Sequence, residues 1–454
     1  DVNGDYPEFS TGTVKMGNAT LSSKGYAVPA YSYLRKYGDF SMWDIYRAEL
    51  PLYSLITPKM SGEMMQSLVQ MYKEGGWMPI FPCWNSYTAA MIGDHSGAAL
   101  ADAYVKGIRN FDAAKAYEGM RLNAFSTPYL AKDYRDGKGR RAIRSYMDNG
   151  YIPLEDMVEE AFHTNEQTSR TLEYAYDDYA VAQMAKALHD SCQDAALRQK
   201  YLEDYNDLMR RSENWRNVIN SATGWADGRY ENGKWENNED LVHRKSYITE
   251  GATCHYTWYV PQNPEGLFEV IRNSKPMDKQ EKQIEKMERK MEKKGETPVR
   301  NEKVIARLDK MFDNGWYWHG NEPCHQVAYL YDAAGAPEKT QERVHHILQT
   351  EYNDTPGGLS GNDDAGQMSA WYVFSSIGFY PVCPGTPYYY IGTPSFDKVT
   401  LNLENGRKFI LSADRQHMDD YLIQSVTLNG KPLGDYRLSH QQILTGGELH
   451  FQMK

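Results

Sequence analysis

Two adjacent carboxylates in a glycine-flanked loop could support acid–base chemistry. Asp363 and Asp364 lie between Gly361 and Gly366, just before a segment with helical spacing. A carboxylate at the start of a helix is stabilised by the helix dipole, so these residues could simply cap the helix. The flanking glycines would also let the backbone approach a ligand closely, which favours a binding or catalytic role. The local sequence is compatible with both roles.

Two further loops place single acids among aromatic rings. One contains Trp318, His319, Asn321 and Glu322 and precedes a predicted helix, and the other contains a lone acid, Glu250, followed by a glycine. Carboxylates that are far apart in sequence and surrounded by Trp and Tyr are typical of glycoside hydrolysis. In that reaction one acid protonates the leaving oxygen and another carboxylate activates water.

The same loops suit a hard metal ion. Their Asn, Asp and Glu side chains offer oxygen ligands, and the five cysteines form no C-x-x-C pair, which favours calcium over zinc. Trp43, Asp44 and Arg47, at the opening of the first long predicted helix, complete the candidate residues. They could equally form a salt-bridged helix start, and spacing alone establishes neither a hydrolytic nor a metal site.

The periodicity of the apolar residues predicts a mainly α chain with a small C-terminal antiparallel β region. Over residues 41–385 apolar side chains recur every three or four positions, with Gly and Pro at the breaks. About a dozen helical segments without an internal repeat favour a toroid of paired helices over a bundle or a solenoid. Over residues 386–454 the period changes to two, and residues 1–40 are expected to be an extended segment or linker. The hairpin turns expected in the β region are Asn405–Gly406 and Asn429–Gly430.

Residues 275–303 form a charged insertion in the helical region. They carry ten basic and seven acidic side chains, with Ile284, Met287 and Met291 at helical spacing. Because the alternating signs cancel the local field, a solvated surface helix is favoured over a calmodulin-like or anionic-surface site.

Composition excludes two broad classes of function. Sixty-one acidic against fifty basic residues give a net charge of −11, which argues against a protein that mainly binds nucleic acid. No run of about 18 apolar residues exists, which argues against a membrane protein. The chain begins at Asp1 rather than Met, so we expect that a leader or a larger segment has been removed.

Five long segments, in this order, carry a family resemblance. They are SMWDIYRAELPLYSLITP (41–58), SRTLEYAYDDYAVAQMAKAL (169–188), TEGATCHYTWYVP (249–261), HGNEPCHQVAYLYDAAGAPEKTQERV (319–344) and GNDDAGQMSAWYVFSSIGFYPVCPG (361–385). Together they closely resemble glycoside hydrolase family 92, the calcium-dependent exo-α-mannosidases. The resemblance implies an (α/α)6 catalytic barrel over residues 41–385, inversion at the anomeric carbon, and a calcium ion that holds O2 and O3 of the terminal mannose.

The resemblance also implies roles for individual residues. Glu250 is expected to be the general acid, with Glu322 as the alternative proton donor. Asp364 is expected to be the general base, with Asp363 as its partner or as a calcium ligand. Inversion needs a water molecule between base and sugar, so the carboxyls of Glu250 and Asp364 are expected about 6.5–9.5 Å apart. The expected metal ligands are Asn321, Glu322, Asp363 and Asp364, and the expected sugar-binding residues are Trp43, Asp44, Arg47, Trp318, His319 and Glu322.

Family members commonly carry an amino-terminal β-sandwich that reaches the active site, and residues 1–40 could not build one. We therefore expect this chain to be the carboxyl-terminal part of a longer protein, or to work with a sandwich on another chain. The implied activity is removal of terminal α-linked mannose, including α-1,2 linkages, from N-glycans or mannan by a secreted or periplasmic enzyme. The alternatives are a non-catalytic mannose-binding remnant and an unrelated (α/α)6 enzyme that acts on another sugar.

Overall fold

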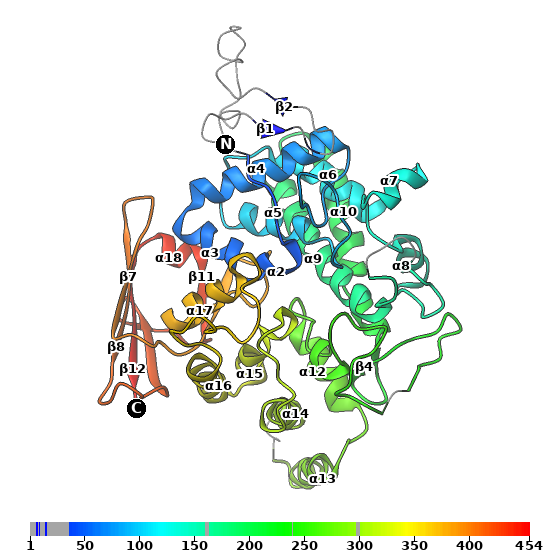
Figure 1. Ribbon diagram of the computed structural model, residues 1–454. Coiled ribbons are helices and arrows are strands. Elements are labelled where there is room, and N and C mark those ends of the chain that lie inside the picture. The colour runs from blue at the N-terminus through cyan, green and yellow to red at the C-terminus, as the bar shows by residue number, and fades with distance from the viewer. Residues whose placement is uncertain are drawn as a thin grey trace.

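The computed structural model describes residues 6, 7, 9, 14, 15, 36–158, 163–237, 239–296 and 300–454. The predicted extended segment, residues 1–40, therefore lies mostly outside the described residues. Within it, β1 (Tyr6–Pro7) and β2 (Val14–Lys15) pair antiparallel beside α4 (Figure 1).

Helices form most of the described chain between residues 41 and 385 (Figure 1). The α-helices are α2 (Met42–Ile45), α3 (Glu49–Ile56), α4 (Pro58–Gly75), α5 (His95–Val105), α6 (Ala113–Phe125), α7 (Ala131–Arg135), α8 (Ile143–Asn149), α9 (Gln167–Ser191), α10 (Ala195–Arg211), α11 (Thr253–Tyr256), α12 (Pro264–Asn273), α13 (Lys279–Lys293), α14 (Glu302–Asp313), α15 (Leu330–Ala334), α16 (Pro337–Thr350) and α17 (Gln367–Ile377). The 3-10 helices are η2 (Asn214–Asn217), η3 (Glu322–Cys324), η4 (Val327–Tyr329) and η5 (Asp364–Gly366), and β3 (Ile219–Asn220) pairs with β4 (Trp225–Ala226). The predicted mainly helical fold is confirmed.

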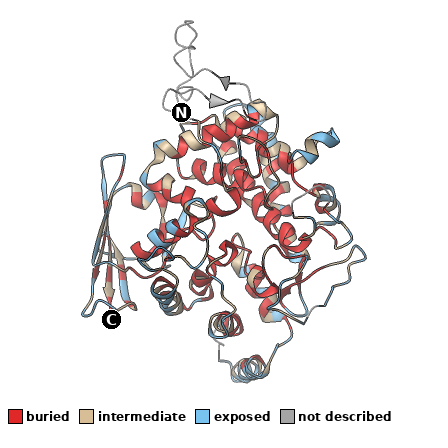
Figure 2. Cartoon of the chain, viewed as in Figure 1, coloured by how far each residue is buried: buried red, intermediate tan, exposed pale blue. Residues whose placement is uncertain are grey.

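Helix α9 lies at the centre of the helical region and packs against α5, α6 and α10. Figure 2 shows that buried residues concentrate in the centre of the helical region, and α5 and α9 are buried over most of their length. The first two-thirds of α9 is buried on nearly every side, including acidic residues. Asp178 is one of them, and it accepts hydrogen bonds from Arg140 and Arg211. Its buried charge is thus paired, as a buried carboxylate requires.

Within the charged insertion, α13 is an exposed helix at the edge of the molecule that packs on α14 (Figure 1). Ile284 and Glu281 of α13 are buried, while the basic side chains of this helix are exposed. The predicted surface helix is therefore confirmed. Among the described residues, none of the helices is both long enough and apolar enough to cross a membrane.

The predicted C-terminal β region contains two sheets and the short helix α18 (His440–Leu444). One sheet has the order β10–β9–β12–β8–β7, from β7 (Lys398–Asn402), β8 (Lys408–Asp414), β9 (Ile423–Leu428), β10 (Lys431–Pro432) and β12 (Gly447–Met453). The other has the order β11–β6–β5, from β5 (Phe379–Tyr380), β6 (Tyr388–Ile391) and β11 (Arg437–Ser439). All pairs are antiparallel except β12 with β8, since β12 returns after α18 to the middle of its sheet. Both expected turns join neighbouring strands, with positive φ at Gly406, Asn429 and Gly430.

The fold brings the candidate loops together from distant parts of the sequence. Helix α2 packs on η5, and α11 packs on η3. Gln367, at the start of α17, reinforces this arrangement. Its Oε1 accepts the backbone N–H groups of Ala48 and Glu49 at 2.9 and 3.2 Å, and its Nε2 lies 3.0 Å from His325 Nδ1.

Candidate active site

Three carboxylates from separate elements converge at the contact of these loops. Asp44 lies in α2, Glu322 begins η3, and Asp364 begins η5. One oxygen atom from each residue lies within 4.8 Å of the other two. Two of the four predicted metal ligands, Glu322 and Asp364, are in this cluster. Asp44 is the third member, although the sequence analysis placed it with the sugar-binding residues.

The carboxylate of Glu322 is buried, and neither of its oxygen atoms has a hydrogen-bond partner. Burial, together with the charges of Asp44 and Asp364, raises its pKa to about 10. A buried, unpartnered carboxylate beside two others is costly unless a positive charge compensates it. Oxygen atoms are also the ligands that calcium prefers, so the cluster fits a hard divalent cation.

Asp44 is buried, and Arg47, in the turn between α2 and α3, lies three residues after it. Burial raises the pKa of Asp44 to about 7, while a hydrogen bond from Ser41 and the charge of Arg47 oppose the rise. The Arg47 guanidinium lies 5.1 Å from the Trp43 ring and 5.3 Å from the Tyr259 ring, and its Nε donates to the Trp43 carbonyl oxygen at 2.9 Å. The positive charge of Arg47 lowers the pKa values of both Asp44 and Glu322.

Glu250 lies in the loop before α11 and is half-buried. Burial raises its pKa, the charges of Glu166 and Asp364 add to this rise, and His163 opposes it. Glu250 also raises the pKa of Asp44 through its charge. This carboxyl group is thus electrostatically coupled to the cluster, and a raised pKa suits a proton donor.

The backbone is strained at both the predicted acid and the predicted base. Glu250 has φ of +49°, and Asp364 and Ala365 have φ of +45° and +58°. Non-glycine residues rarely occupy this left-handed region, and such strain is concentrated at functional sites. The fold therefore holds these two loops in conformations that their own sequences disfavour.

The two adjacent aspartates, Asp363 and Asp364, contact different groups. Asp363 Oδ1 accepts hydrogen bonds from the backbone N–H and the hydroxyl of Ser369, both at 2.9 Å. It therefore ties down the first turn of α17, close to the capping interpretation of the sequence, whereas Asp364 joins Asp44 and Glu322.

The glycines of this loop allow close packing within the protein. A Cβ atom at Gly361 would lie 2.5 Å from the carbonyl oxygen of Gly320, and one at Gly366 would lie 3.3 Å from Glu49 Oε1. Protein atoms therefore fill the space on the Cβ side of both glycines, and an approach of a ligand to their backbone stays a prediction.

Glu49 is a further acidic residue near the site that the sequence analysis missed. Burial raises its pKa to about 7, a hydrogen bond with Tyr53 opposes the rise, and the charge of Asp363 adds to it. Its only sequence signal was its position five residues after Asp44.

The predicted sugar-binding aromatics divide into one exposed and two buried rings. Trp318 is 45% exposed and so is able to meet a ligand. Trp43 is buried, and its Nε1 donates to Glu173 at 2.9 Å. His319 is buried between the hydroxyls of Tyr317 and Tyr352, each 2.7 Å from a ring nitrogen. Trp43 and His319 are thus held by hydrogen bonds within the protein, and their contact with a sugar stays a prediction. Asn321, the residue before Glu322, is also buried.

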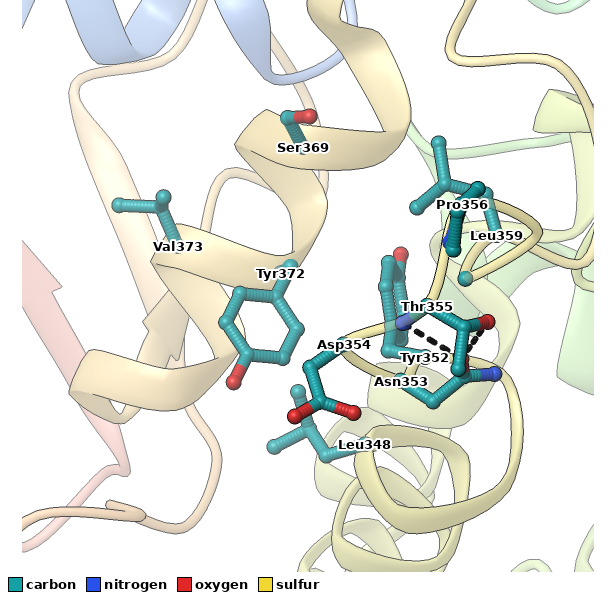
Figure 3. A pocket seen from close by; sticks show the side chains of 11 residues that line it. Leu348, Tyr352, Asn353, Asp354, Thr355, Pro356, Leu359, Ser369, Tyr372 and Val373 are labelled. Carbon is teal, nitrogen blue, oxygen red and sulfur yellow. Dashed lines mark hydrogen bonds between the residues drawn. The ribbon is translucent and has the colours of Figure 1, made fainter.

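A pocket of about 520 Å³ lies between α17 and the loop that follows α16 (Figure 3). Ser369, Tyr372 and Val373 of α17 form one side, and the 352–359 loop forms the other. Ser369 connects it to the site through Asp363, but the three clustered carboxylates are not in its lining.

Known proteins resemble the chain over almost its whole length. A family 92 α-mannosidase from Bacteroides thetaiotaomicron superposes with a TM-score of 0.80 at 31% identity, over 100% of this chain and 52% of that protein. The family's inverting mannosidase from the same bacterium gives a TM-score of 0.79 at 31% identity, over 99% and 55%. A protein of Arthroderma benhamiae, described as an uncharacterized secreted glycosidase, is 29% identical over 439 residues, which cover 90% of this chain and 50% of that protein.

The chain thus spans about half the length of these relatives. The sequence model of the glycosyl hydrolase family 92 catalytic domain matches residues 13–454. With that match over nearly all of its length, the chain belongs to glycosyl hydrolase family 92.

Proposed function

We propose that this chain is the catalytic part of a calcium-dependent, inverting exo-α-mannosidase that removes terminal α-linked mannose from glycans. The observation that carries the proposal is the carboxylate cluster of Asp44, Glu322 and Asp364, in which the buried Glu322 has no hydrogen-bond partner and the charge of Glu250 acts on Asp44. The likeness to the Bacteroides mannosidases supports mannose as the sugar.

Asp44, Glu322 and Asp364 would hold the calcium ion, with Asn321 next to them. When bound, calcium supplies a positive charge that attracts the O2 and O3 hydroxyls of the terminal mannose. The protein's own contribution is to keep these carboxylates together, with Asp44 and Glu322 buried and Asp364 half-buried, where their mutual repulsion favours the binding of a cation.

Glu250 is the proton donor in this proposal. Its raised pKa keeps the carboxyl protonated at a pH where an exposed glutamate would be ionised, so it can protonate the leaving oxygen. Glu322, the alternative donor, is buried inside the carboxylate cluster and is better placed as a metal ligand. In this proposal Glu250 donates the proton and Glu322 binds the metal ion.

Asp364 is the general base that takes a proton from the attacking water. A carboxylate has two oxygen atoms, so one can face the cation while the other faces the water. Asp363 holds the start of α17 through Ser369 and keeps the neighbouring Asp364 in place. For inversion the carboxyls of Glu250 and Asp364 should stand about 6.5–9.5 Å apart, and this separation stays a prediction.

The substrate we propose is a non-reducing terminal mannose of an N-glycan or mannan, with α-1,2 among the linkages. We further propose that the enzyme is secreted or periplasmic. The description of the fungal relative as secreted supports that location. A β-sandwich in the remaining half of a longer protein, or on another chain, would complete the pocket. The presence of Glu250, Glu322 and both aspartates argues against a non-catalytic mannose-binding remnant.

Proton NMR of the chain with α-1,2-, α-1,3- and α-1,6-linked mannobiose tests this proposal. We expect β-mannose to appear first, and a chelator to stop the reaction. Initial release of α-mannose would contradict inversion, and hydrolysis that survives chelation would contradict the role of calcium. Mannose binding without turnover on all three linkages would contradict catalysis by this chain.

A further inference from the structure

Glu173, on the central helix α9, accepts hydrogen bonds from three other elements. Its side chain is 0% exposed. Oε1 accepts from Trp43 Nε1 of α2 and from the Tyr256 hydroxyl of α11, both at 2.9 Å. Oε2 lies 3.2 Å from Nε2 of His95, on α5. Helices α2, α5 and α9 lie together in the middle of Figure 1.

Two of these donors lie next to the candidate catalytic loops. Trp43 directly precedes Asp44, and Tyr256 lies six residues after Glu250. One oxygen atom of Glu173 thus joins the helix that carries a predicted metal ligand to the segment that carries the predicted acid. Trp43, Tyr256 and Glu173 are all buried, so both connections lie in the protein interior.

His95 fixes Glu173 in turn. Its Nδ1 lies 2.7 Å from Asp177 Oδ1, one turn along α9, and its ring stacks on Tyr46 at 4.0 Å. Burial opposes a charged ring, but Asp177 and Glu173 raise the pKa of His95 to about 9, so both ring nitrogens donate. The space is fully used, since a Cβ atom at Gly93 would lie 2.3 Å from His95 Nε2 and 2.8 Å from Glu173 Oε2.

We propose that Glu173 is a positioning residue of the candidate active site, which fixes the Asp44 and Glu250 segments relative to each other through Trp43 and Tyr256. This inference rests on the proposed function for its kinetic consequences. Catalytic groups are most effective when held in place beforehand, and a misplacement of about 1 Å can cost about 100-fold in rate.

Two substitutions separate hydrogen bonding from charge. Glu173→Gln keeps an amide oxygen for Trp43 and Tyr256, and its NH2 can donate to Nε2 of a neutral His95. Glu173→Leu removes all three connections at similar size. Glu281 offers matched controls. Its side chain is also 0% exposed and accepts hydrogen bonds from Arg307 Nε and Nη2 at 3.0 Å, but it lies on the outer helix α13.

At saturating calcium, we expect Glu173→Leu to lower kcat on mannobiose about 100-fold and to change KM less than about threefold. Glu173→Gln should recover kcat to within about fivefold of the unmodified chain. Glu281→Leu and Glu281→Gln should lose thermal stability without this loss of kcat per folded molecule. Equal kcat values for Glu173→Leu and Glu281→Leu would overturn the proposal.

Two readouts do not need turnover. Glu173→Leu should weaken the binding of calcium alone about tenfold in calorimetry, because Asp44 loses its support. Hydrogen exchange should rise in residues 41–47 and 250–258 in Glu173→Leu but not in Glu281→Leu. Unchanged exchange in both segments overturns the positioning role, even if the chain hydrolyses mannosides. If the chain neither hydrolyses mannosides nor binds calcium, the proposed function fails, and the exchange measurement alone decides the role of Glu173.

Discussion

Ser369 donates two hydrogen bonds to Asp363 but none to the neighbouring Asp364, so the two aspartates have different surroundings. The backbone N–H and the hydroxyl of Ser369 both reach Asp363 Oδ1 at 2.9 Å. The carboxylate of Asp364, one residue later, belongs instead to the cluster with Asp44 and Glu322. Identical side chains at adjacent positions therefore serve a helix start and a candidate catalytic centre.

Substitution of the two aspartates should separate stability from activity. Asp363→Ala should cost about 1 kcal/mol of unfolding free energy, because the first turn of α17 loses its acceptor. Asp364→Asn should leave stability nearly unchanged, since Asn tolerates positive φ, and should lower kcat about 10²–10⁴-fold. Urea unfolding and mannobiose kinetics measure the two effects. Asp363→Asn, which keeps Oδ1, is the control, and a larger loss of kcat in it than in Asp364→Asn would contradict this division.

Glu322→Gln should change how the thermal stability of the chain responds to calcium. The carboxylate is buried without a hydrogen-bond partner, and burial raises its pKa to about 10, so Glu322→Gln should raise the melting temperature of the calcium-free chain. Calcium at about 100 times its dissociation constant should stabilise the unmodified chain by about 2.7 kcal/mol. Glu322→Gln should lose that gain. Thermal unfolding with calcium or a chelator checks both, and an equal calcium response in the two proteins would exclude Glu322 as a ligand.

Glu250 and Glu322 can be distinguished by the leaving group of the substrate. Glu250→Gln should lower kcat on mannobiose about 10²–10⁴-fold, but only slightly on a dinitrophenyl mannoside, whose leaving group needs no proton. Glu322→Gln should impair both substrates, because a metal ligand serves both. In the unmodified chain burial raises the pKa of Glu250 above 4.5, the ordinary pKa of a glutamate. The activity on mannobiose should therefore fall with rising pH only above pH 4.5. The opposite pattern of leaving-group dependence would make Glu322 the donor.

The sequence alone predicted the features that depend on residues close together in the chain. The acid loops, the Asn–Gly turns and the helical spacing of residues 41–385 all carry their signal within a few residues. The grouping of Asp44 with Glu322 does not, because it depends on α2 packing on η5 and α11 packing on η3. Glu173 was hidden for the same reason, since in sequence it is one acid within a helical stretch. The parallel pairing of β12 with β8 likewise depends on a strand that returns after α18.

The Asp44 carboxyl should destabilise the calcium-free chain increasingly as the pH rises. Burial raises the pKa of Asp44 from the ordinary 3.8 to about 7, so between these values the Asp44 carboxyl binds more protons in the folded chain than in the unfolded chain. The contribution of Asp44 to the unfolding free energy must then fall as the pH rises through this window. Buried histidines such as His325 and His440, whose pKa values are lowered to about 3, act in the opposite direction. The contribution of Asp44 is therefore measured as the difference between the unmodified chain and Asp44→Asn in urea unfolding in chelator at about pH 5 and about pH 8. Calcium should reverse this effect of pH on stability, because it favours the ionised carboxylates. If the calcium-free chain loses no more stability than Asp44→Asn between these pH values, Asp44 does not lie in a repulsive carboxylate cluster.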